Sequence, residues 1–202
     1  MRHLGTLAIR GTAFLLGLVC LLPETAAADE ECRGGNTEFV SWLVKNSANV
    51  PTDLRGLSTH PVLYREAAFQ VLSPAQQAAL WREHVQAYRR DHPRLTLKQL
   101  AVLDAILAVL TPDVFEPASA VDTSQVEAAV VEAFGTQESQ ALIRTLGPPD
   151  TDPGLSLTTA NLCKCSLQSA FCSLGKCQPG KCHRQSSGCG SWWRYPCDGV
   201  CK

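Results

Sequence analysis

The sequence lacks the local patterns that mark common catalytic and metal sites. It has five histidines but no HExxH motif, and it has no Gly-rich phosphate loop and no serine, cysteine or aspartate in a recognisable nucleophile motif. It also lacks a long hydrophobic run, because the apolar stretch from Thr12 to Leu22 is too short to span a bilayer. We therefore expect a protein that is not an enzyme, that needs no cofactor or metal, and that is not a polytopic membrane protein.

Cysteine is missing from most of the chain and crowded at one end. The 202 residues are 45% hydrophobic and 18% charged with a net charge of −1, which excludes a wholly disordered chain and a collagen. Of the ten cysteines, none lies between Cys32 and Cys163, and eight lie between Cys163 and Cys201. This distribution indicates two unlike pieces joined end to end.

Residues 1–28 have the pattern of a signal peptide. Basic residues precede the apolar run, and three alanines then offer a cleavage site between Ala28 and Asp29. The alternatives are a membrane anchor, which the length of the run disfavours, and a lipoprotein acylated on Cys20, which the branched Val19 disfavours. We expect secretion to an extracellular or periplasmic, oxidising compartment. Cys32 is then left over, as a free thiol, a dimer bridge or a link to the other cysteines.

Residues 29–146 predict an acidic all-α domain of about six helices. Capping boxes begin helices at Ser73 and Thr96, and apolar side chains recur at helical spacing throughout. Gly135 is expected to end one of the later helices. His84 lies beside an apolar stripe, and we expect a packed histidine there rather than a metal ligand.

Residues 147–160 predict a linker. Three prolines and two glycines between Gly147 and Gly154 cannot continue a helix. Such a joint is where a processing protease would cut, although a plain linker that is never cut fits the same composition.

Residues 161–202 predict a small, irregular, disulfide-rich module. Only nine apolar residues accompany the cysteines, too few to offset chain entropy by burial alone. We expect four disulfides, each contributing on the order of 2–4 kcal/mol, with 105 pairings open. A zinc site assisted by His183 is disfavoured because no paired CxxC occurs. The eight cysteines are Cys163, Cys165, Cys172, Cys177, Cys182, Cys189, Cys197 and Cys201.

The charges of the two pieces are opposite. Residues 29–160 hold ten basic and seventeen acidic residues, a net charge of −7, whereas residues 161–202 hold six basic and one acidic, a net charge of +5. Cationic and aromatic side chains together suit an anionic bacterial envelope or membrane surface, and we expect no nucleic-acid partner. A plainer interpretation is that the aromatic residues form the core of the module itself. The residues predicted to bind the target are Trp192, Trp193, Tyr195, Lys164, Lys176, Lys181, Arg184 and Arg194.

Several short motifs, in order, resemble the precursors related to the bacteriocin fulvocin C. In the module they are the run from Ala160 to Cys165, the run from Gly188 to Trp192, and the closing Cys197 and Cys201. In the middle region the similar segments are Phe39 to Leu43, Pro61 to Arg65 with Ala68 and Phe69, Leu72 to Pro74 through Leu80 and Trp81, and Leu95 and Thr96 before Gln99.

The resemblance implies a secreted precursor whose cysteine-rich end is an antibacterial peptide. The opposite charges suggest that the helical region keeps the basic module silent until a protease cuts the linker. Two other functions stay open: a secreted binding module for a carbohydrate or a protease, displayed on a helical domain, and a structural envelope protein.

Overall fold

A computed structural model describes residues 41–117, 119–150, 163–169, 172 and 176–202. The predicted signal peptide, Cys20, Cys32 and residues 151–160 of the linker lie outside this part of the chain. Within it, no helix has the length and apolarity that crossing a membrane requires.

Residues 41–150, called the helical part below, consist of helices and the connections between them. Residues 41–45 are helical, and short 3-10 helices lie at Ser47–Asn49 and Pro112–Phe115. The longer elements are α2 (Leu54–Ser58), α3 (Val62–Gln70), α4 (Pro74–Asp91), α5 (Leu97–Val109) and α6 (Ser124–Ile143).

Side-chain caps fix where the helices begin. Both predicted capping boxes are confirmed, because the hydroxyls of Ser73 and Thr96 accept hydrogen bonds from the backbone N–H groups of Gln76 and Gln99. Asp53 caps α2 in the same manner, since its carboxylate accepts from the N–H of Gly56 at 2.9 Å.

Gly135 bends α6 instead of ending it. Its backbone has φ +75° and ψ 168°, so the helical hydrogen-bond ladder is interrupted there, as the predicted helix end implied. The chain then resumes a helix as far as Ile143, because Leu142 and Ile143 are buried and continue the apolar stripe. The expected stop is therefore a kink.

Residues 163–202, called the cysteine module below, contain short strands. They are β1 (Cys177–Gln178), β2 (Gln185–Cys189), β3 (Tyr195–Cys197) and β4 (Val200–Cys201). β1 pairs with β4 and β2 pairs with β3, both antiparallel, and a 3-10 helix at Ser191–Trp193 connects β2 to β3. The fold class is confirmed: a helical part is followed by a small disulfide-rich region.

All eight cysteines of the module form disulfides. These bonds indicate an oxidising environment. The sulfurs of Cys165, Cys172 and Cys177 lie within 4.8 Å of one another, but each belongs to a disulfide and is not a free thiolate that could bind zinc. The pairs are Cys163–Cys182, Cys165–Cys177, Cys172–Cys201 and Cys189–Cys197.

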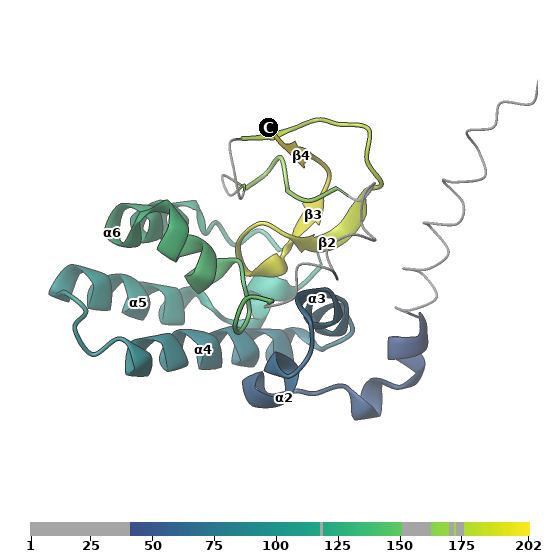
Figure 1. Cartoon of the computed structure of the whole chain (residues 1–202), viewed down its shortest axis with the longest axis horizontal. Coiled ribbons are helices and arrows are strands. Elements are labelled where there is room, and N and C mark those ends of the chain that lie inside the picture. The colour runs from purple at the N-terminus through teal and green to yellow at the C-terminus, as the bar shows by residue number, and fades with distance from the viewer. Residues whose placement is uncertain (1–40, 118, 151–162, 170–171, 173–175) are drawn as a thin grey trace, which may run out of the picture.

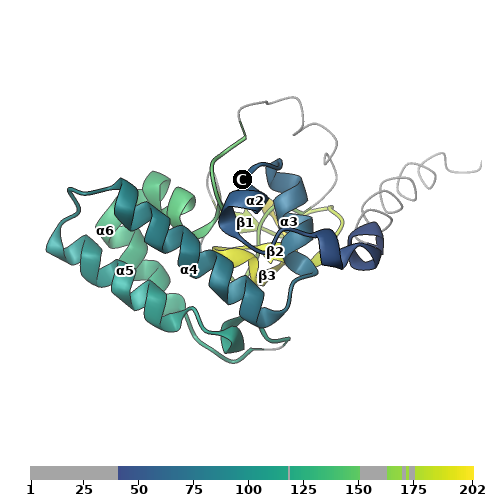
Figure 2. The same ribbon diagram turned by 90° about the horizontal axis from the view of Figure 1, so that it is seen from below.

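The helical part and the cysteine module share one hydrophobic core. Trp192 and Trp193 of the module are buried in the same cluster as Phe69, Trp81 and Leu103. Figure 1 shows the module lying above α3, and in the view from below its strands lie behind α3 (Figure 2). The helical part and the cysteine module, which differ in composition, are therefore packed against each other.

Replacing Trp193 by alanine should lower the free energy of unfolding by about 3–5 kcal/mol, because it leaves a large cavity in the shared core. Urea denaturation followed by circular dichroism measures the change. Trp42→Ala is the matched control, since the Trp42 side chain is 54% exposed, and it should cost less than about 1 kcal/mol. Equal losses in the two variants would contradict the shared core.

Candidate functional site

The aromatic loop, residues 190–196, is held at both ends. The Cys189–Cys197 disulfide and the pairing of Cys189 with Tyr195 close it, so it projects from β2 and β3 as a fixed corner. Gly190 has φ +68°, and a Cβ at this position would overlap the ring of Tyr195 and the side chain of Ser169. Glycine is therefore required for this tight turn.

Trp193 carries the main contact between the module and the helical part. Its ring packs edge to face against Phe69 at 5.5 Å and against Trp81 at 5.6 Å between centroids. Its indole N–H donates to the carbonyl of Arg144, at the end of α6, at 2.8 Å. With 2% of its surface exposed, the side chain is a wedge in the helical core.

Tyr195 forms a hydrogen-bond network with the start of α6. Its hydroxyl donates to the carboxylate of Glu127 at 3.0 Å, and Thr123 donates to the same oxygen at 2.6 Å. Glu127 and Thr123 are buried. Desolvation raises the pKa of the Tyr195 hydroxyl, so it stays a hydrogen-bond donor.

Arg194 also faces the helical part. Its Nη2 donates to the carbonyl of Val121 at 2.9 Å, and its guanidinium carbon lies 4.7 Å from the centroid of the Tyr195 ring. Its Nη1 is buried without a hydrogen-bond partner among the described residues. The Arg194 guanidinium is therefore held against the helical part and is not available to an external target.

The aromatic residues predicted to bind the target are not exposed in this conformation. Trp192 and Trp193 are fully buried, and Tyr195 is half-buried and bonded to α6. The physical reason is that the module has too few apolar residues to bury two indoles by itself, whereas α3, α4 and α6 supply an apolar surface for them. The alternative interpretation, that the aromatic residues form the core of the module itself, predicted the burial of the tryptophans but not that this core is shared with the helical part.

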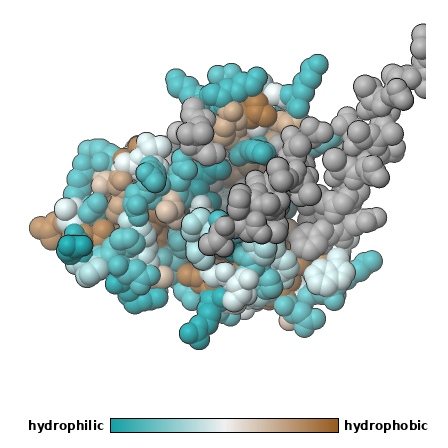
Figure 3. All heavy atoms as spheres, viewed as in Figure 1, coloured by the Kyte–Doolittle hydropathy of each residue, from teal (hydrophilic) through white to brown (hydrophobic). Residues whose placement is uncertain are grey.

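The remaining predicted cations are exposed. They lie on the module away from the aromatic loop, and on the face shown in Figure 3 hydrophilic side chains project from the outer edge of the module. Lys176 lies opposite Lys202, because the backbones of the two residues exchange hydrogen bonds of 2.8 and 3.1 Å. The structure thus separates the aromatic residues from most of the cations. The four exposed cations are Lys164, Lys176, Lys181 and Arg184.

Both tryptophans of the aromatic loop have a left-handed backbone. Trp192 and Trp193 each have φ +57°, which bulky residues rarely adopt. Such a conformation costs on the order of 1–3 kcal/mol per residue and persists only where the surroundings impose it. Here the disulfide and the helical part impose it, so separation from the helical part would allow the loop to relax.

Arg65 fastens the first residues of the predicted linker to α3. Its buried guanidinium donates to the carbonyls of Leu146 and Pro148 and contacts the carboxylate of Asp150 at 3.2 Å. Burial lowers the pKa of Arg65, and the charge of Asp150 opposes that effect. Gly147, at φ +83°, lies against this side chain, and a Cβ there would collide with Arg65 and Ser58.

Glu66, the residue after Arg65, is an ionisable group close to the docking site of Trp193. Desolvation raises the pKa of its carboxyl to about 7, although the charges of Arg144 and Arg65 act in the opposite direction. Asp150 adds to the increase. Arg144 is also the residue whose carbonyl accepts the indole N–H of Trp193.

None of the residues that contact the aromatic loop could be identified as its partners from the sequence. Phe69 and Trp81 were named only in the segments that resemble the fulvocin C-related precursors, and nothing in their spacing indicates a partner more than 100 residues later in the chain. Glu127 and Thr123 carry no local signal either, apart from their position at the start of a helix. Only their burial in the folded chain reveals their role.

No family model matches the chain, and no curated protein or solved structure is significantly similar to it.

The contribution of Glu66 to stability should fall as pH rises from 5 to 8. The folded pKa of Glu66, about 7, lies above its ordinary value of 4.5. Its contribution is therefore complete below pH 4.5 and is lost as the pH passes 7, by up to about 3 kcal/mol. Glu66→Gln, which stays neutral, should remove this part of the dependence in urea titrations at each pH.

Asp113→Asn is the control for this titration, because Asp113 is an exposed carboxylate outside α3. It should leave the pH dependence unchanged. If Glu66→Gln and the unchanged protein lose the same stability between pH 5 and 8, the carboxyl of Glu66 does not ionise with a raised pKa.

Proposed function

We propose that the protein is a secreted precursor of a cationic, disulfide-rich antibacterial peptide, and that the helical part keeps this peptide inactive. The observation that carries the proposal is the burial of the aromatic loop. The side chains best suited to enter a membrane interface, Trp192, Trp193 and Tyr195, are inserted in or bonded to the helical part.

The composition of the module supports an action at the bacterial envelope. Four disulfides allow a region with few apolar residues to keep its shape outside the cell. The exposed cations would attract it to an anionic surface, and the aromatic loop would then provide apolar contact. The resemblance to fulvocin C-related precursors supports the same function.

The proposal that the helical part masks the module is supported by the burial of the aromatic loop and not by charge pairing between the two pieces. The opposite net charges suggest attraction, but none of the four ion pairs between described residues joins the module to the helical part. The described contacts are instead ring packing and hydrogen bonds, made by Trp193, Arg194 and Tyr195. Salt screens such contacts much less than it screens exposed charges.

In this proposal activation has two steps. A protease first cuts the linker, and the module then leaves the helical part. Because the contacts of the aromatic loop do not depend on the linker, the cut alone leaves them in place. Departure of the module would expose the tryptophans and free Arg194 from the carbonyl of Val121.

The free module should inhibit bacterial growth at a concentration at least about tenfold lower than the intact chain. It is prepared by cutting the linker at an inserted protease site and separating the pieces in denaturant with the disulfides intact. Growth assays on a panel of bacteria then compare the free module, the intact chain and the reduced module, which should be inactive because it cannot fold.

Equal inhibition by the intact chain and the free module, with no binding between the separated pieces at low salt, would reject the masking. Inhibition by none of the preparations, with every disulfide intact, would reject the antibacterial function.

The two pieces should remain associated after the linker is cut. Size-exclusion chromatography under native conditions should give one peak that contains both. In the conservative variant Tyr195→Phe, which loses only the hydroxyl bonded to Glu127, the pieces should bind about tenfold more weakly. Gln178→Ala, an exposed change in β1, is the control and should bind as the unchanged chain does. Immediate separation of the unchanged pieces would show that the shared core does not hold them.

A further inference from the structure

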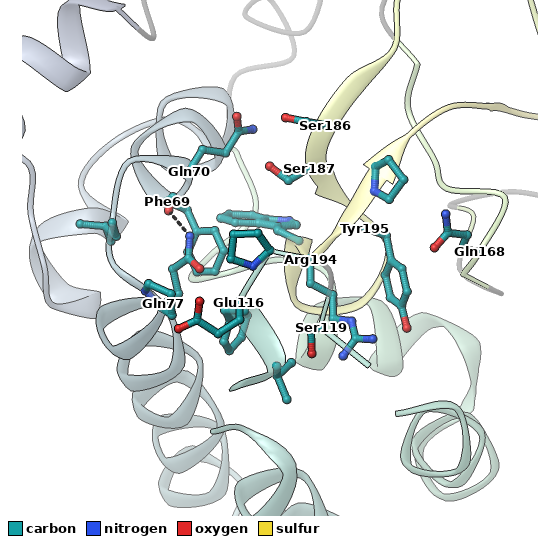
Figure 4. A pocket seen from close by; sticks show the side chains of 17 residues that line it. Phe69, Gln70, Gln77, Glu116, Ser119, Gln168, Ser186, Ser187, Arg194 and Tyr195 are labelled. Carbon is teal, nitrogen blue, oxygen red and sulfur yellow. Dashed lines mark hydrogen bonds between the residues drawn. The ribbon is translucent and has the colours of Figure 1, made fainter. Parts of the chain in front are cut away.

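A cleft of about 680 Å³ lies at the junction between the helical part and the cysteine module. Its walls come from α3, the start of α4 and the segment that follows Phe115 on one side, and from β2 and β3 on the other. Figure 4 shows these side chains around the opening. The volume lies within the range of small-molecule sites.

The polar side chains of the cleft are mostly uncharged and available. Gln70, Ser186, Ser187 and Gln168 have no side-chain hydrogen bond to any described residue. In Figure 4 the hydroxyls of Ser186 and Ser187 are directed toward the side on which Gln70 lies. A Cβ added at Gly188 would lie 3.0 Å from the amide nitrogen of Gln70, so α3 and β2 approach each other closely here.

The charges of the cleft balance. Glu116 is its only carboxylate among the described lining residues and Arg194 its only guanidinium, and Arg194 already bonds to Val121. One positive and one negative charge cancel, so these walls favour neither an anionic nor a cationic ligand. A neutral ligand suits these walls best.

Aromatic rings form the apolar part of the cleft. Phe115 and Tyr195 are half-buried there, and Phe69 and Trp193 close the inner side. The faces of such rings are electron-rich and accept the C–H groups of a saturated ring. Amides and hydroxyls, which both donate and accept, match the hydroxyl groups at the rim of the same ring.

We propose that this cleft binds a neutral oligosaccharide. Amide and hydroxyl side chains without hydrogen-bond partners, partly exposed aromatic rings and balanced charge together are what a chain of sugar rings requires. The inference does not depend on antibacterial activity. Since the helical part supplies Gln70 and the module supplies Ser186 and Ser187, the complete site exists only while the two are docked, and a bound sugar would hold them together.

Isothermal titration calorimetry on the intact chain tests the proposal. The probes are two neutral trisaccharides, one of N-acetylglucosamine and one of glucose. At least one should bind with a dissociation constant in the micromolar to low millimolar range. Ser186→Trp, which fills the cleft from an exposed position, should abolish binding, and Gln70→Ala should weaken it by about tenfold.

Gln125→Ala is the matched control, because Gln125 is an exposed glutamine on α6 outside the cleft. It should bind as the unchanged protein does. Circular dichroism of each variant establishes that it is folded. Should Ser186→Trp fail to fold, Gln70→Ala and Gln168→Ala, which only shorten side chains, take its place.

Three results would overturn the proposal. The first is no binding of either trisaccharide at 10 mM to the unchanged chain. The second is binding that folded Ser186→Trp or Gln70→Ala leaves unchanged, since the sugar would then lie elsewhere. The third is binding of a short neutral peptide, such as trialanine, with neither sugar bound, which would assign the cleft to peptides. Inactivity of the free module against bacteria would reject the proposed function without affecting these outcomes.

Discussion

The insertion of Trp193 between Phe69 and Trp81 is the contact on which the rest of the structure depends. It supplies the small module with an apolar core that its own sequence cannot provide, and it completes the core of the helical part. The indole N–H bonded to the carbonyl of Arg144 fixes the orientation of the wedge at the end of α6. The strained backbone of the aromatic loop and the disulfide across its base both serve to present this side chain.

The packing of Trp193, and not the opposite charges of the two pieces, holds the module against the helical part. Attraction between an acidic and a basic piece would be weak, diffuse and sensitive to salt. A buried aromatic wedge is local, specific in shape and largely independent of salt. Four cations of the module, Lys164, Lys176, Lys181 and Arg184, are exposed and available to an external partner, whereas Trp192 and Trp193 are buried.

Local patterns predicted local structure well and long-range packing poorly. The capping boxes at Ser73 and Thr96 each lie within four residues, so the sequence determines them almost alone. The count of eight cysteines predicted four disulfides, but their pairing depends on how β1 to β4 align, which no spacing specifies. The sequence around Trp193 does not distinguish an exposed side chain from one buried in a core of the module alone or in a core shared with the helical part. Arg65 was named only in a segment of the resemblance, because the carbonyls that accept its hydrogen bonds belong to residues 81 and 83 positions later in the chain.

Because Arg65 and Trp193 each anchor one side of the linker, cleavage of the chain and dissociation of the two pieces are separate events. Arg65 holds the first residues of the linker to α3, and Trp193 holds the module against the same helix, so the two sides of a cut are anchored independently. A protease acting between them would change covalent connectivity without changing the surface of the molecule. The lifetime of the cut form would then be set by the dissociation rate of the buried wedge. If the linker is cut, the packing of one indole would therefore determine how long the two pieces stay together.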